Sequence, residues 1–128
     1  MTLQRLTPIL LARDLKETMV FYTDVLGFKV LDTMGDPPQF CALERDDVQL
    51  MFTWDPPHEH APGEDHDHPD PKMTGVLYFY PDNVTALHDS VASRASICEP
   101  LGVRPHGMRE FAVLDPNGYR LRFGEDAS

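Results

Sequence analysis

A few polar side chains occur in short strand-like runs that are otherwise apolar. Gln49, Arg120 and Arg122 alternate with aliphatic and aromatic residues, and Met51, Tyr78 and Tyr80 fall in the same phase of alternation. Buried amide and guanidinium groups need polar partners, whereas a concave pocket uses a few such groups to orient a small molecule. The pattern predicts a ligand pocket, although a sheet face exposed to solvent or covered by a dimer partner would show the same mixture of residues.

Other chemistry has less support in the sequence. The chain has no Gly-x-Ser-x-Gly nucleophile motif, no glycine-rich phosphate loop and no dinucleotide fingerprint. Arg109 and Glu110 form a polar pair in an apolar strand, which is either a structural ion pair or a site where Arg109 faces the pocket. A histidine-rich stretch could collect a transition metal, but its spacing matches no ordered zinc site and a solvated acidic loop explains it better. Its candidate ligands are His58, Glu59, His60, His66, Asp67 and His68.

The elements that would position the pocket occur twice along the chain. A strand over 6–12 leads into a helix capped by Asp14, and a strand over 73–80 leads into a helix capped by Asp82 or Asn83. Three further strands follow each helix, over 28–34, 40–45 and 48–53 and then over 98–103, 108–114 and 119–123. The repeat predicts an α+β fold of two βαβββ modules that form a curved mixed sheet around a concave pocket.

Strand alternation assigns a face to each residue. One set is uniformly apolar and is expected beneath the helices: Leu6, Leu10, Leu50, Phe52, Leu77, Phe79, Leu121 and Phe123. The other set mixes apolar and polar groups and is expected to line the pocket: Thr7, Ile9, Leu11, Gln49, Met51, Thr53, Val76, Tyr78, Tyr80, Arg120 and Arg122.

Composition sets the class of protein. The 128 residues predict one domain whose halves, about 1–54 and 73–128, are joined by a flexible linker over 55–72 rich in Pro, His and Asp. A formal net charge of -10 argues against nucleic-acid binding. No targeting segment or membrane-length apolar run is found, and Cys41 and Cys98 fit reduced thiols, so a cytoplasmic location is expected.

Two stretches resemble the signatures of the vicinal oxygen chelate superfamily, which includes glyoxalase I, extradiol dioxygenases and bleomycin-resistance proteins. They are Phe21-Tyr22-Thr23-Asp24-Val25-Leu26-Gly27-Phe28 and Asp115-Pro116-Asn117-Gly118-Tyr119. The run from Gly107 to Phe111 is most similar to the bleomycin-resistance branch of this glyoxalase/bleomycin-resistance fold. The resemblance implies a small acidic homodimer that exchanges an N-terminal strand and binds a cationic or planar aromatic drug without chemistry.

The resemblance also implies site residues. Aromatic candidates for stacking are Phe40, Trp54, Tyr78, Tyr80 and Phe111, and His106 stands where bleomycin-binding members usually have tryptophan. Enzymes of the superfamily hold a metal at positions that correspond to Thr7, Gln49, Val76 and Arg122. Valine offers no donor and arginine repels a cation, so we expect no metal and no cofactor.

These features favour a metal-independent binding protein that sequesters an antibiotic-type small molecule. Gln49, Arg109 and Arg122 would orient the ligand. The alternatives are a metal-dependent glyoxalase-like or dioxygenase-like enzyme with an atypical site, and an assembly protein whose pocket has lost its role.

Overall fold

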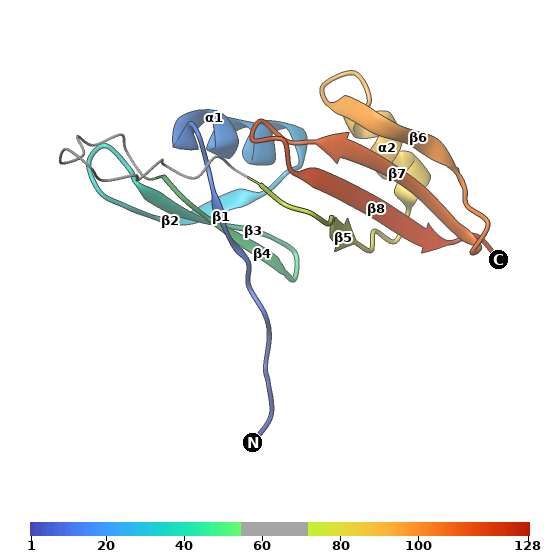
Figure 1. Ribbon diagram of the computed structural model, residues 1–128, viewed down its shortest axis with the longest axis horizontal. Helices are drawn as coiled ribbons and strands as arrows, with labels where there is room; N and C mark the ends of the chain where they lie inside the picture. The colour runs from blue at the N-terminus through green and yellow to red at the C-terminus, as the bar shows by residue number, and fades with distance from the viewer. Residues whose placement is uncertain (55–71) are drawn as a thin grey trace, which may run out of the picture. The chain divides into compact units, whose positions relative to one another are not determined.

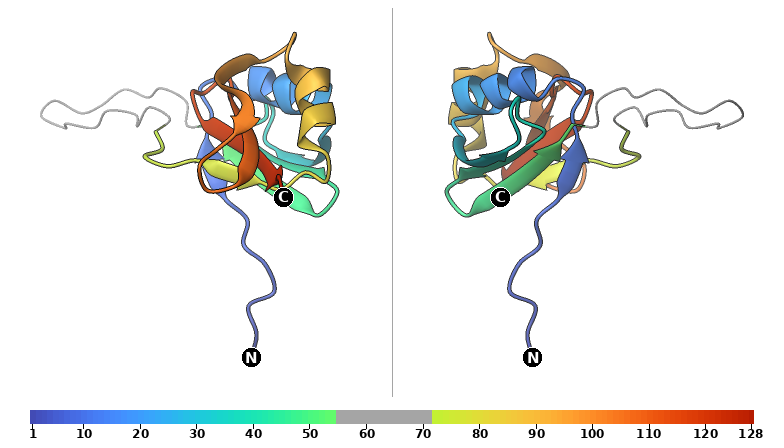
Figure 2. Two further views of the ribbon diagram at one scale, coloured as in Figure 1. Left: turned by 90° about the vertical axis from the view of Figure 1, so that its right-hand side faces the viewer. Right: turned by 90° about the vertical axis from the view of Figure 1, so that its left-hand side faces the viewer.

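The computed structural model describes residues 1–54 and 72–128, in two compact units, Met1–Pro71 and Lys72–Ser128. Each unit contains a strand, a helix and three further strands, and each helix packs against its own sheet (Figures 1 and 2). The α+β class and the βαβββ repeat are therefore confirmed, with one four-stranded mixed sheet in each module. The predicted linker over 55–72, with its histidine-rich candidates, falls almost entirely outside the described residues.

The first unit forms a sheet in the order β1-β4-β3-β2, in which β1 and β4 are parallel and the other pairs antiparallel. Its elements are β1 (Ile9–Leu11), α1 (Leu15–Val20), the π-helix η1 (Phe21–Val25), β2 (Lys29–Met34), β3 (Phe40–Arg45) and β4 (Val48–Thr53). The first strand is shorter than the predicted 6–12, and Leu6 lies outside it and is exposed, so its predicted place under the helix is wrong.

Local chemistry explains the helix of this unit. Asp14 Oδ1 accepts a hydrogen bond from the Glu17 backbone N at 3.0 Å, as predicted for the N-cap. The helix then widens, because the Leu26 N–H donates to the carbonyl of Phe21, five residues earlier. Gly27 ends it with φ +73, a conformation that glycine adopts without a steric penalty. Tyr22 is fully buried from this segment, and its ring lies 5.1 Å from that of Phe52.

The second unit repeats the arrangement, with sheet order β5-β8-β7-β6 and only the β5–β8 pair parallel. Its elements are β5 (Leu77–Phe79), α2 (Val84–Val91), β6 (Ser96–Val103), β7 (Met108–Leu114) and β8 (Arg120–Asp126). Asn83 is the N-cap of α2, since its side chain accepts from the Ala86 N–H. The turn between β7 and β8 has Gly118 at φ +88, as its sequence predicts.

The two faces of the second sheet differ in chemistry. On the α2 side, the Phe123 ring stacks between those of Phe79 and Phe111, at centroid distances of 5.0 and 5.1 Å. The opposite side, called the polar face below, carries Tyr78, Tyr80, Glu99, Glu110, Arg120 and Arg122. The alternation assigned to β5 and β8 is therefore confirmed.

The sheet edges β2 and β6 are irregular. The pairing of β2 with β3 shifts register between Val30 and Asp32, and every residue of β2 is exposed. The pairing of β6 with β7 shifts twice, on either side of Glu99.

None of the helices in the described ranges is both long and apolar enough to cross a membrane.

Candidate functional site

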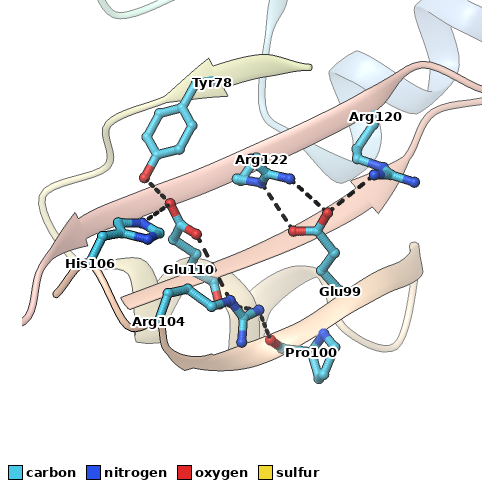
Figure 3. Close-up of polar contacts among 8 residues, drawn as sticks. All are labelled: Tyr78, Glu99, Pro100, Arg104, His106, Glu110, Arg120 and Arg122. Atoms are coloured by element: carbon cyan, nitrogen blue, oxygen red, sulfur yellow. Dashed lines mark hydrogen bonds and ion pairs between the residues drawn. The ribbon is translucent and has the colours of Figure 1, made fainter. Parts of the chain in front are cut away.

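The polar face contains a nearly buried carboxylate at its centre. Glu110, on β7, has a side chain only 5% exposed. It accepts a hydrogen bond from the Tyr78 hydroxyl at 2.5 Å and lies 3.4 Å from His106 Nε2 and 3.9 Å from Arg104 Nε (Figure 3). A buried charge of this kind is tolerated because it is paired and hydrogen-bonded. Glu110 therefore joins Tyr78 of β5 to Arg104 and His106 of the turn between β6 and β7.

A second carboxylate fixes the arginines of the same face. Glu99, on β6, accepts two hydrogen bonds from Arg122, from Nε at 3.0 Å and from Nη2 at 2.9 Å. Arg120 Nη1 lies 3.4 Å from the same carboxylate. The paired bonds from Arg122 fix the orientation of both groups, because the planar guanidinium matches the carboxylate geometry. Figure 3 shows Arg122 between this cluster and the one around Glu110.

The contacts shift the pKa values of three groups. Burial, followed by the hydrogen bond to Glu110, raises the pKa of Tyr78 from 10.0 to about 12, so the phenol stays protonated and acts as a donor. The hydrogen bond from Arg122 lowers the pKa of Glu99, and the same bond raises the pKa of Arg122. At neutral pH, Glu99 and Arg122 are therefore held as an ion pair beside a protonated Tyr78.

Gly124 makes room for the Tyr78–Glu110 contact. It pairs with Glu110 across the β7–β8 ladder. A Cβ at this position would overlap the Tyr78 hydroxyl and lie 2.8 Å from Tyr78 Cζ. Only glycine therefore lets the phenol cross β8 and reach the carboxylate.

Tyr80 adds an exposed aromatic surface to this face. Its ring lies 4.9 Å from that of Tyr78, and the residue is 79% exposed. Tyr78 is the register partner of Arg122, so the two tyrosines and the arginine are neighbours. The structure therefore brings Tyr78, Tyr80, His106 and Arg122 together from the predicted set.

Two of the residues predicted to contact a ligand do not lie on the polar face. Phe111 is fully buried on the α2 side, stacked on Phe123 and edge-on to His88, so the prediction that its ring stacks on a ligand is wrong. Arg109 shares that side of β7, because residues two apart in a strand point the same way. Arg109 and Glu110 therefore point to opposite faces, and neither interpretation of the pair holds.

The remaining predicted residues belong to the first unit. Gln49 and Met51 share one face of their sheet with Phe40, through the pairs Phe40–Thr53, Ala42–Met51 and Glu44–Gln49. Trp54 follows β4, and its backbone N donates to the Gln39 carbonyl at 2.8 Å. All four are partly exposed, and their role in binding stays a prediction.

Three residues of the ion-pair clusters around Glu99 and Glu110 were not predicted as site residues: Glu99, Arg104 and Glu110. Glu99 lies in a strand whose register shifts on both sides of it, so alternation could not assign its face. The polar pair of Arg109 and Glu110 in an otherwise apolar strand was the available signal for Glu110, but its hydrogen-bond donor Tyr78 lies 32 residues away in sequence.

The family-type metal positions do not fit a metal. Val76 has no donor atom, and Arg122 holds a permanent positive charge that already binds Glu99 through two nitrogens. Thr7 and Gln49 alone would leave a divalent ion without the carboxylate or imidazole ligands it needs. Within residues 1–54 and 72–128, no group of three His, Cys, Asp or Glu side chains is placed to hold a metal either.

Comparisons with known proteins give a consistent family. The sequence model described as Glyoxalase/Bleomycin resistance protein/Dioxygenase superfamily matches residues 3–123. A similar solved structure is the bleomycin-binding protein from bleomycin-producing Streptomyces verticillus complexed with copper(II)-bleomycin. It is 26% identical, with 96% of each chain covered and a TM-score of 0.67. A search of curated proteins found no match.

Two further structures share the fold. TioX from Micromonospora sp. ML1 is 19% identical, with 96% of this chain and 98% of that chain covered and a TM-score of 0.71. A protein of unknown function from Agrobacterium tumefaciens str. C58 is 23% identical, with 98% and 96% covered and a TM-score of 0.71. At these identities, the likeness concerns the fold alone.

Proposed function

This chain belongs to the Glyoxalase/Bleomycin resistance protein/Dioxygenase superfamily, and on that premise we propose that it is a metal-independent small-molecule-binding protein of the bleomycin-resistance type. It acts in the cytoplasm by sequestration, holding an antibiotic-type ligand without changing it. The proposed ligand contacts are Phe40, Gln49, Met51, Trp54, Tyr78, Tyr80, His106 and Arg122. Arg109 and Phe111 are left out because both lie on the α2 side of β7.

The observation that carries this proposal is the arginine at a family metal position. Arg122 is bound to Glu99 through two hydrogen bonds, so the carboxylate nearest to it is already neutralised by a guanidinium. The polar face keeps donors and an exposed aromatic ring, which are the groups that hold and orient a ligand. This arrangement supports binding over metal-assisted catalysis.

The first prediction tests binding without metal. Chelator-treated protein titrated calorimetrically with metal-free bleomycin should give a saturable signal near one drug per chain. Adding a divalent metal to the protein should leave that affinity unchanged, because the proposed contacts involve no metal. Binding or turnover that appears only after metal is added would favour the alternative enzyme, and no binding in either condition would remove bleomycin as a ligand.

A homodimer with an exchanged N-terminal strand is part of the proposal. The segment before β1 runs away from its own sheet (Figures 1 and 2), and Leu3 and Leu6 on it are 96% and 87% exposed. A second copy of the chain that buries these exposed leucines removes apolar surface from water, which stabilises a dimer. The arm is therefore the proposed site of exchange.

A second prediction concerns this arm. The double variant Leu3→Ser/Leu6→Ser should raise the dimer dissociation constant about a hundredfold or more, since each buried leucine contributes about 1.5–3 kcal/mol. Light scattering after size-exclusion chromatography over a range of concentrations measures the change. Gln4→Ser/Arg5→Ser alters two exposed polar residues of the same arm and should leave the dimer intact. Equal masses for both variants would argue against exchange.

A further inference from the structure

We propose that the ligand of the polar face is an aromatic compound carrying an acidic group, a carboxylate or a phosphate, and that Arg122 and Arg120 bind this group. The inference rests on the proposed function and narrows its ligand. In this proposal Arg122, which stands at a position where enzymes of the superfamily hold a metal ion, supplies the fixed positive charge that contacts the ligand.

The charges at one end of the polar face leave an excess of positive charge. Arg120 and Arg122 share the single carboxylate of Glu99, so one positive charge is left over. Glu110, the other acid beside Arg122, is paired with Arg104 and bonded to Tyr78. Asp126 also lies on this face, but at the opposite end of β8, about 20 Å from Arg120 at the usual rise of a strand. It is hydrogen-bonded to Ser128.

This local excess outweighs the overall charge of the chain. The formal net charge of -10 would favour a cationic ligand at long range. Charges on a protein surface are screened over about 8 Å at physiological salt, however, whereas a ligand group in contact with a guanidinium lies within about 3 Å. The contact therefore determines which ligand group is preferred at this position.

The two arginines still have donors to offer. Arg122 uses Nε and Nη2 on Glu99, and Nη1 makes no hydrogen bond within the described part of the chain. Arg120 reaches Glu99 through Nη1 alone, and its side chain is 49% exposed. Guanidinium groups with unused N–H donors match the oxygens of carboxylates and phosphates. An anionic group could thus join this cluster without displacing Glu99.

The aromatic part of the ligand follows from what lies beside Arg122. Tyr78 is its register partner on β5, and the ring of Tyr80 is in contact with that of Tyr78 and open to solvent. A planar ring stacked on Tyr80 would have its acidic substituent directed past Tyr78 toward Arg122 and Arg120. Figure 3 shows Tyr78 and the two arginines on this face. The face therefore selects for a molecule with an aromatic end and an acidic end.

The test uses four naphthalene probes that share a ring and differ in charge: naphthoate, naphthyl phosphate, naphthamide and a quaternary naphthylmethylammonium. Calorimetric titration of the full chain at physiological salt should give the tightest binding for an anion. Naphthamide should bind about tenfold or more weakly, because it lacks the charge-assisted bonds. The carboxylate and phosphate probes show which acid is preferred.

Variants assign the effect to the arginines. Arg122→Gln and Arg120→Gln should each weaken binding of the anionic probe about tenfold, while the affinity for naphthamide changes less than about twofold. Arg122→Lys should recover part of the loss. Lys16→Gln removes the same unit charge from the exposed side of α1 and should change neither affinity. If Arg122→Gln does not fold, the half-exposed Arg120 carries the test.

The outcomes separate the two proposals. Tighter binding of the cation or of naphthamide than of both anions overturns this inference and leaves sequestration standing. An anion preference that survives both arginine substitutions also overturns it. If neither the naphthalene probes nor bleomycin binds with or without metal, both this inference and the proposed function fail.

Discussion

Replacing Phe111 by alanine should lower the free energy of unfolding by about 3–5 kcal/mol, the usual cost of removing a buried phenylalanine. The ring is fully buried, stacks on Phe123 at 5.1 Å and meets the edge of His88 at 5.1 Å. Its two ring neighbours, His88 and Phe123, are held in α2 and β8, so we expect the cavity to stay largely unfilled. Urea denaturation followed by circular dichroism measures the loss.

A matched substitution on the polar face gives the contrast. Tyr80→Ala removes a ring of similar size that is 79% exposed, and should change stability by less than about 0.5 kcal/mol while weakening ligand binding. A Phe111→Ala protein that keeps its stability but no longer binds ligand would instead indicate that Phe111 contacts the ligand.

Gly124→Ala is expected to separate Tyr78 from Glu110. The added methyl would overlap the phenol and lie 3.1 Å from Glu110 Cγ, so the tyrosine side chain must swing away. Glu110 then loses its hydroxyl donor while remaining buried, which costs about 1–3 kcal/mol. Once in water, the Tyr78 phenol should titrate nearer to 10.0 than to about 12. Ultraviolet titration of the phenols, with Tyr78→Phe to identify the signal, reports that change.

The sign of the accompanying pH effect is fixed. Because folding raises the pKa of Tyr78, its contribution to stability is complete below pH 10.0 and is lost as pH rises toward about 12. Gly124→Ala should reduce this alkaline loss. Gly75→Ala adds the same methyl where no heavy atom lies within 4 Å, and should alter neither stability nor titration. A Gly124→Ala protein with wild-type titration would contradict the role assigned to Gly124.

Sequence patterns predicted the elements well where one face of a strand is buried and the other is not. In β8, Leu121 and Phe123 are buried on the α2 side and Arg120 and Arg122 lie on the polar face, so period-two alternation was informative. Asp14, Gly27 and Asn83 marked helix ends because their local hydrogen bonds and dihedral angles depend on few neighbours.

The same reasoning failed in β7, because that strand is buried on both faces. Phe111, Ala112 and Val113 are all fully buried, so the apolar run has no alternation from which to assign a face. Phe111 and Arg109 were placed wrongly for this reason. Hydrogen-bonded pairing with β8, which sequence alone does not give, is what fixes their side.

The contact between Tyr78 and Glu110 could not be predicted because the two residues meet only in the folded unit. Tyr78 lies 32 residues away in sequence, and its approach depends on the missing side chain of Gly124. The Glu99–Arg122 pair spans 23 residues and a strand with an irregular register. Contacts of this kind follow from strand order, which local patterns leave open.

The proposed sequestration requires a protein as abundant as the molecule it binds, and high abundance makes strand pairing between chains a hazard. The irregular edges β2 and β6 address this. Val30 and Leu31 are exposed on β2, but the register shift beside them breaks the regular row of backbone groups with which another chain could pair. Lys29 and Asp32 add charge to the same edge. In β6 two register shifts and Pro100, which has no N–H to donate, have the same effect. Both repeats thus keep their outer strands poor partners for polymerisation.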